Sequence, residues 1–187
     1  MAENTTVFTI EVALARVEPK VWRRLSIPAD YSLAQVHRIL QIAMCWGDDH
    51  LHVFNVGENE YSDPAFDLGE TEDEGGLTLA GAFSKSTKHV RYVYDFGDDW
   101  VHDLKLLERK SVTGEDLRPQ CIAGARACPP EDIGGPGGYA RFLKVISDPT
   151  HEEYEEMLEW AGGPFDPEAF NHRDVDAALV GWWQRSQ

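Results

Sequence analysis

The sequence predicts an α+β fold: a β-grasp-like (ubiquitin-like) mixed sheet followed by a helical C-terminal portion. Strand patterns dominate residues 7–110 and helical patterns dominate residues 137–187, a separation typical of α+β proteins. The N-terminal order of hairpin, helix, strand and second hairpin is the order of a β-grasp sheet. Of the 187 residues, 42% are hydrophobic, which is enough for a single domain over residues 1–187 with its own core.

The first hairpin is predicted by two segments that alternate apolar and polar residues. In residues 7–17 every second residue from Phe8 to Leu14 is apolar, so these side chains share one face. Residues 20–27 repeat the pattern. Glu18-Pro19 lies between them and is expected to form the turn.

A helix and a third strand are expected next. Ser32 and Gln35 match a capping box, in which two side chains satisfy free backbone N–H groups reciprocally. Apolar residues then recur at helical spacing as far as Trp46-Gly47, where the helix is expected to end. The third strand is expected over residues 50–56.

The middle of the chain predicts a loop, a short helix and a second hairpin. Residues 57–76 are acidic and rich in glycine, which indicates a loop. Thr78 is in a position to cap a short helix. Residues 88–96 and 100–108 alternate again, and the intervening Gly-Asp-Asp sequence is a turn signal.

The last third of the chain predicts irregular structure and then three helices. Residues 111–136 are rich in proline and glycine and are expected to be irregular. Helices are expected over about 137–147, from a capping box that starts at Thr150, and over about 173–185.

The charge distribution excludes several functions. The chain has 33 acidic and 17 basic residues, a net charge of -16, so direct nucleic-acid binding and adsorption to an anionic membrane are not expected. The excess is confined to residues 57–76 and 148–172, since the rest of the chain is neutral. These two stretches form either solvated surfaces or an acidic docking surface, for a basic partner or as a mimic of nucleic-acid phosphates.

The N-terminal sequence and the cysteines indicate a cytoplasmic protein. The first residues lack the basic and apolar regions of a secretory signal, and no apolar run reaches the about 20 residues that a bilayer requires. Three cysteines without a CxxC pair fit neither a disulfide scaffold nor a zinc ribbon.

The most unusual segment is YVYDFGDDWVH, residues 92–102. Its candidate ligand-binding residues are Tyr94, Asp95, Asp98, Asp99, Trp100 and His102. Trp100 and His102 share one strand face, and Asp95 lies across the turn, where a carboxylate orients an imidazole for general-base work or metal ligation. The alternative is that the aspartates are turn residues and that the motif only stabilises the fold.

Two further segments carry residues that can bind a ligand or a metal. His50 and His52, at i and i+2 of the expected third strand, present two imidazoles on one face, and Cys121 and His102 are further candidate metal ligands. The second segment, residues 121–138, contributes Arg126, Glu131 and Asp132. It ends in glycines before a helix, but it lacks the lysine of a P-loop, and its two acids repel an anion. An ordered loop packed over the second hairpin is the alternative.

These segments together resemble one known family. The motifs HLHVF, YVYDFGDDWVHDL, CIAGARACPPEDIGGPGGY and FDPEAFN, with residues 22–46, resemble the plasmid pRiA4b Orf-three-like family from about residue 7 to residue 180. The resemblance implies one α+β domain and an association with plasmids and insertion-sequence elements. The family carries a resolvase-like label, but the nucleophilic serine and basic arm of serine resolvases are not apparent.

The sequence leaves three functional hypotheses open. The first is a cytosolic binding or adaptor protein, an accessory of mobile genetic elements. Its polar site, between the YDFGDDWVH hairpin and the CPPEDIGG loop, would take a protein or small-molecule ligand. The second is a hydrolase-like enzyme that uses the same residues with a divalent metal as cofactor. The third is an acidic regulator that mimics DNA.

Overall fold

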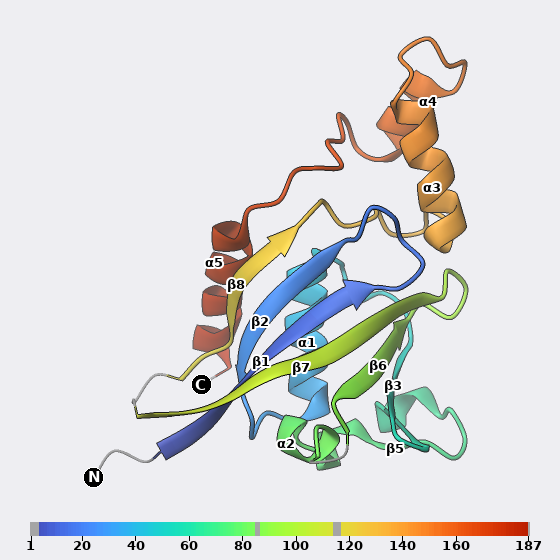
Figure 1. The fold of residues 1–187 in the computed structure, drawn as a ribbon. Coiled ribbons are helices and arrows are strands. Elements are labelled where there is room, and N and C mark those ends of the chain that lie inside the picture. The colour runs from blue at the N-terminus through green and yellow to red at the C-terminus, as the bar shows by residue number, and fades with distance from the viewer. Residues whose placement is uncertain (1–3, 85–86, 114–116, 187) are drawn as a thin grey trace.

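The computed structural model describes residues 4–84, 87–113 and 117–186, and within them the chain forms one large sheet covered by helices (Figure 1). The strands are β1 (Asn4–Leu14), β2 (Trp22–Pro28), β3 (His52–Val56), β4 (Asn59–Ser62), β5 (Glu72–Asp73), β6 (His89–Tyr94), β7 (Trp100–Thr113) and β8 (Gln120–Ala125). The helices are α1 (Leu33–Met44), α2 (Leu79–Ala82), α3 (Gly135–Ile146), α4 (Tyr154–Trp160) and α5 (His172–Arg185), with 3-10 turns η1 (Pro64–Phe66) and η2 (Glu74–Gly76).

The α+β class is confirmed, whereas the β-grasp assignment is not. The strand order is β5-β4-β3-β6-β7-β1-β2-β8. A β-grasp sheet has its first strand in a parallel pairing, but β1 pairs antiparallel with both β2 and β7. The one parallel pair among the described strands is the short contact between β4 and β5 at the sheet edge.

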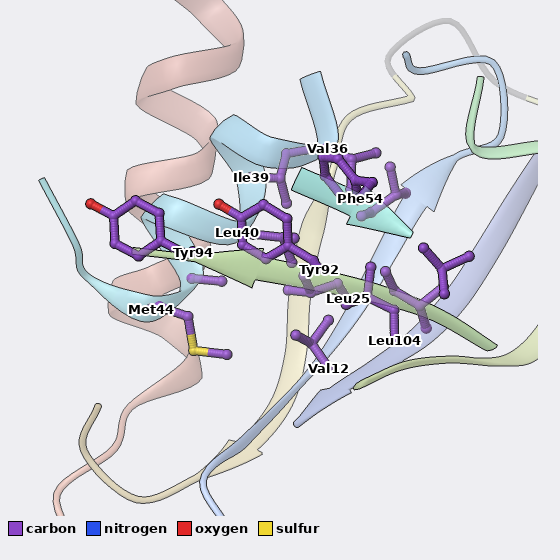
Figure 2. Packing of buried hydrophobic residues seen from close by; sticks show 14 of the residues in the cluster. Val12, Leu25, Val36, Ile39, Leu40, Met44, Phe54, Tyr92, Tyr94 and Leu104 are labelled. Atoms are coloured by element: carbon purple, nitrogen blue, oxygen red, sulfur yellow. The ribbon is translucent and has the colours of Figure 1, made fainter. Parts of the chain in front are cut away.

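The core lies between one face of the sheet and helix α1. Buried and partly exposed residues alternate along β1, as the sequence pattern predicts. Figure 2 shows Val12, Leu25 and Leu104 of the sheet pointing toward Ile39 and Leu40 of α1. The opposite face of the sheet carries partly exposed side chains.

Helix α1 begins and ends by recognisable local rules. The Ser32 side chain accepts a hydrogen bond from the backbone N–H of Gln35, and the Gln35 side chain accepts one from the backbone of Ser32. The predicted capping box is therefore present. At the other end Cys45 adopts a left-handed conformation, and its N–H closes the last turn.

The predicted irregular stretch contains a strand. Strand β8 pairs with β2 at the sheet edge, so the expectation of irregular structure over residues 111–136 is wrong for residues 120–125. Its sequence, QCIAGA, has only one β-branched residue, and the pairing contains a register shift, which explains the weak signal. Strand β7 also continues to Thr113, and residues 114–116 lie outside the described part of the chain.

Two other local predictions differ from the structure. The acidic stretch 57–76, expected to be a loop, contains β4, β5 and two 3-10 turns. The capping box expected at Thr150 does not form, because Thr150 donates hydrogen bonds to the Asp148 carboxylate and α4 begins only at Tyr154. The local Asx interaction replaces the helix cap.

The C-terminal helices occupy two positions. Helix α5 packs beside α1 and β8, where Arg118 makes a bidentate ion pair with Asp176. Helices α3 and α4 extend from one corner, and the 57–76 stretch lies at the opposite end of the molecule (Figure 1). The two acidic stretches therefore form separate surfaces. Among the described residues no helix has both the length and the apolar character needed to cross a membrane.

Arg23 is a buried cation that joins four segments. Its guanidinium donates hydrogen bonds to the carbonyls of Ala43, Trp22 and Ala125 and to the sulfur of Cys128, and it stacks on Phe170. These contacts tie β2 to the end of α1, to β8 and to the CPPEDIGG loop, residues 128–135.

His102 belongs to the core rather than to an exposed site. It is fully buried, its Nδ1 lies 3.0 Å from the carbonyl oxygen of Trp100, and its ring contacts Tyr92 and Trp46. Burial lowers the pKa of His102 from 6.5 to about 4. The ring is therefore neutral in the folded protein at pH 7.

We expect His102 to make stability depend on pH. Between pH 6.5 and about 4 the unfolded chain binds a proton at this position that the folded chain does not. Its contribution is complete above pH 6.5 and falls by up to about 1.4 kcal/mol per pH unit below it, about 3 kcal/mol in total. Urea unfolding of wild type and His102→Leu at several pH values measures the difference in slope.

The matched control is His89→Gln, which removes an exposed histidine from the neighbouring strand β6. This variant should keep the wild-type slope. Equal slopes for His102→Leu and wild type would show that His102 is not held neutral by burial.

Candidate functional site

Three segments far apart in the sequence meet at one corner of the sheet. They are the segment before β3 (residues 47–51), the DFGDD turn between β6 and β7 (residues 95–99) and the CPPEDIGG loop. Figure 1 shows the start of α3, where the CPPEDIGG loop ends, beside the turn that joins β6 and β7. The predicted motifs thus lie together in space.

Asp95 organises the DFGDD turn. Its Oδ1 accepts hydrogen bonds from the backbone N–H groups of Gly97 and Asp98, and its own N–H donates to the carbonyl of Leu51. Asp95 adopts a positive φ of 56°, which aspartate tolerates better than most residues. The turn is therefore fixed against the segment before β3, and Oδ2 of Asp95 lies 3.8 Å from Nε2 of His50.

The CPPEDIGG loop docks on this turn. The N–H of Gly134 donates to Oδ2 of Asp98, and Gly135, at φ 66°, lies so close to the Asp98 carbonyl that a Cβ atom would overlap with it. Glu131 accepts hydrogen bonds from the Tyr94 hydroxyl at 2.8 Å and from the Gly47 N–H at 2.7 Å. The expected packing of the loop over the second hairpin is thus observed.

Docking brings His50 between two carboxylates. Nε2 of His50 lies 3.2 Å from Oδ1 of Asp132 and 3.8 Å from Oδ2 of Asp95. The three ligand atoms all lie within 4.8 Å of one another. The side chains of His50, Asp95 and Asp132 are 29%, 11% and 71% exposed, so this set, called the outer cluster below, is open to solvent.

His52 belongs to a different cluster, although it lies only two residues from His50. Strand β3 begins at His52, so His50 precedes the regular alternation, and the two rings have different neighbours: Tyr94 contacts His50, whereas Tyr92 contacts His52. His52 is buried, bonds Glu74 through Nε2 at 2.8 Å and stacks on His37. The expectation that His50 and His52 hold one metal together is therefore not met.

The other candidate residues have different environments. Trp100 is buried in the core, Asp99 pairs with Arg16, and Arg126 pairs with Glu168. Arg126 thus carries no free charge for a phosphate.

Cys121 is buried, Cys128 is partly buried, and both are neutral thiols. Burial raises the pKa of Cys121 to about 11 and that of Cys128 to about 12. A thiol with so high a pKa is a poor nucleophile. Neither cysteine belongs to a group of three potential metal ligands among the described residues.

One hollow lies near this corner, and another lies on the sheet. One, of about 590 Å³, lies behind the CPPEDIGG loop and is lined mostly by apolar side chains, among them Trp46, Phe165 and Phe170. The other, of about 1000 Å³, lies on the open face of the sheet and contains none of the predicted site residues. Among the described residues, none of the second hairpin lines the first hollow.

Comparison with known proteins identifies the family. The model of the plasmid pRiA4b ORF-3-like protein matches residues 6–174. The chain belongs to this family. It is 34% identical over 186 residues, 96% of its length, to uncharacterized protein y4hQ of Sinorhizobium fredii (strain NBRC 101917 / NGR234), of which 95% is covered.

A solved structure of the same fold also exists. It is the crystal structure of a protein of unknown function, MM3350 from Methanosarcina mazei Go1, with a TM-score of 0.84 and 34% identity. The match covers 91% of this chain and 98% of that one. The family resemblance inferred from the motifs is therefore confirmed, and it brings no activity with it.

Sequence reasoning missed three residues that the structure places beside His52. His37 lies on the apolar face of α1, Asp48 follows that helix, and Glu74 lies in the acidic stretch treated as solvated. The available signal was His37 and Gln41 at i and i+4, two polar residues on the buried helix face. Glu74, only 4% exposed, has no comparable signal in the sequence.

We expect Gly135→Ala to destabilise the docked loop. A side chain at φ 66° costs about 1–2 kcal/mol, and its Cβ also overlaps with the Asp98 carbonyl, so the loss of unfolding free energy should be at least about 2 kcal/mol. Gly137→Ala is the matched control, since nothing lies within 4 Å of its Cβ. Urea unfolding should show Gly137→Ala at or above wild-type stability, and an equal loss in both variants would contradict the close approach at Gly135.

Proposed function

We propose that the chain is a metal-binding protein whose outer cluster holds a divalent cation through His50, Asp95 and Asp132. The observation that carries the proposal is their convergence. Three segments separated by 37 to 82 residues supply one imidazole and two carboxylates whose ligand atoms lie within 4.8 Å of one another.

The distances fit a shared ion. Ligand atoms that bind one ion at about 2.0–2.2 Å lie roughly 3–3.5 Å apart in a tetrahedral arrangement. The 3.2 Å and 3.8 Å separations from His50 Nε2 are close to this range, so small side-chain movements suffice. The two ligand segments are held by backbone contacts of the turn and the loop rather than by the cluster itself.

The charge also favours a cation. Two carboxylates and one neutral imidazole balance a divalent charge, and the net charge of -16 attracts cations toward the whole surface. One nitrogen and two oxygen ligands suit zinc, manganese or ferrous iron.

The exposure of Asp132 favours ligand exchange at the ion. Three protein ligands leave coordination positions for water or for a polar group of a small molecule or partner protein. Such a site suits a binding or adaptor role at the motif corner. The family's association with a plasmid supports a setting as an accessory of mobile elements.

A hydrolase-like activity is the second candidate, because a metal-bound water is a nucleophile at neutral pH. The neighbouring groups limit the choice of general base. Burial and the Glu131 hydrogen bond raise the pKa of Tyr94, so its hydroxyl stays protonated. Glu131 already accepts two hydrogen bonds, from the Tyr94 hydroxyl and the Gly47 N–H.

Isothermal titration of zinc and manganese into metal-free protein tests the proposal. Wild type is expected to bind an ion at this site with a dissociation constant in the micromolar range or below. Removing one of three ligands in His50→Ala or Asp132→Asn should weaken binding at least about 10-fold.

The control is Asp99→Asn, an exposed carboxylate of the same turn that pairs with Arg16 and lies outside the cluster. It should leave the affinity unchanged. Equal weakening in Asp99→Asn and Asp132→Asn would indicate only a diffuse attraction of cations to an acidic surface, and no binding by wild type would exclude the site.

A further inference from the structure

A second group of titratable side chains lies inside the protein, below the segment that carries His50. The inner cluster consists of His37, Asp48, His52 and Glu74. The His37 and His52 rings stack with centroids 3.6 Å apart and planes 9° from parallel. Both histidines and Glu74 are at most 4% exposed. Such a concentration of ionisable groups in a small domain requires a specific reason.

The hydrogen bonds of His37 form a complete chain. Gln41 donates to the Tyr92 hydroxyl, which in turn lies 2.8 Å from Nδ1 of His37, and Nε2 of His37 lies 2.7 Å from Asp48. Burial raises the pKa of Tyr92, so its hydroxyl is protonated and donates to Nδ1. Burial also lowers the pKa of His37 to about 2 despite the adjacent carboxylate, so the ring is neutral and donates its Nε2–H to Asp48.

The hydrogen bonds of the His52 ring, in contrast, are incomplete. Its Nε2 bonds Glu74, but its Nδ1 is buried and has no hydrogen-bond partner among the residues that the structure describes. Either protonation state of the ring leaves one unsatisfied buried atom, a bare lone pair or a bare N–H, which costs about 1–3 kcal/mol. A histidine with one nitrogen bonded to a carboxylate and the other free has the arrangement of a metal ligand.

No basic side chain among the described residues compensates the negative charge of Glu74. Asp48 is paired with Arg38, whereas Glu74 faces no lysine or arginine among the described residues. A buried carboxylate without a cation is strongly unfavourable. A positive ion near His52 would compensate this charge as well as satisfy Nδ1.

We infer that the inner cluster is a second, structural metal site, in which His37, Asp48 and His52 would bind a zinc ion and Glu74 would orient His52. The ligand atoms of these three residues lie within 4.8 Å of one another. Two imidazoles and a carboxylate are a donor set that zinc prefers, and both imidazoles are buried whereas Asp48 is 20% exposed. On loading, the His37 proton would move from Nε2 to Nδ1, which would then donate to the Tyr92 hydroxyl.

Loading has a geometric consequence. The lone pairs of imidazole nitrogens lie in the ring planes, so a single ion at the edges of both rings requires the planes to tilt from their present 9°. Because both histidines are buried, zinc is expected to reach them during folding rather than by diffusion into the folded protein.

The test removes the outer cluster first. The double variant His50→Ala/Asp132→Asn is unfolded in urea with a chelator, refolded with zinc and dialysed, and its metal content is measured. We expect one zinc per chain. We also expect a Tm about 5–10 °C above that of the same variant refolded without zinc, when zinc is present at about 100 times its dissociation constant.

Adding His52→Gln to this background should abolish both the bound zinc and the Tm shift. His89→Gln, which replaces an exposed histidine, is the matched control and should change neither. If the His52 variant does not fold, the imidazole ¹⁵N chemical shifts of the double variant with and without zinc decide the question, since a ligating nitrogen shifts.

The possible outcomes separate the two sites. A folded double variant that retains no zinc overturns the inner site, whatever wild type binds at the outer cluster. A second outcome is that the double variant retains one zinc while wild type binds no additional, reversible zinc. That result would support the inner site and exclude the outer one. A protonated His52 in a metal-free, folded chain would assign the cluster to a buried ion pair instead.

Discussion

The close contact between Gly135 and the carbonyl of Asp98 determines how the CPPEDIGG loop lies on the DFGDD turn. No larger residue fits there, and the flanking Gly134 N–H bonds the Asp98 carboxylate. Glu131 fixes the other side of the loop by accepting from both Tyr94 and Gly47. Asp132, between these attachments, is thereby held beside His50 although its own side chain is mostly exposed. The geometry of the outer cluster is thus a product of backbone packing, which is why an open site can still have a defined shape.

Arg23 extends this constraint into the body of the domain. A buried guanidinium is acceptable only when its donors are satisfied, and here three carbonyls and the Cys128 sulfur satisfy them. Those acceptors come from different segments, so the end of α1, the edge strand β8 and the start of the CPPEDIGG loop must all be in place together. The indole of Trp46 adds a hydrogen bond to the Pro129 carbonyl at the same junction. Folding of the sheet and placement of the loop are therefore coupled.

The sequence predicts the elements with regular patterns well and the tertiary contacts poorly. Strands β1, β2, β6 and β7 and helix α1 follow from alternation and capping, because these signals are local. Strand β8 was missed since QCIAGA pairs only through neighbours that the sequence does not identify, and Gly124 there faces the ring of Phe170. The β-grasp expectation rested on element order alone, which does not determine the direction in which β1 pairs. The sequence identified the motif residues of the outer cluster. It did not predict that His52 belongs to a different cluster, because that depends on where strand β3 begins.

Segment 48–52 links the outer and inner clusters. Asp48 and His52 belong to the inner cluster, whereas His50, which lies between them in the sequence, contacts Asp132 in the outer cluster. Because His50 is attached to a backbone anchored on both sides by inner-cluster residues, whatever orders Asp48 and His52 also orders His50. An ion in the inner cluster would thus order His50 in advance. The outer site would then lose less conformational freedom on binding its own ligand, without any contact between the two sites.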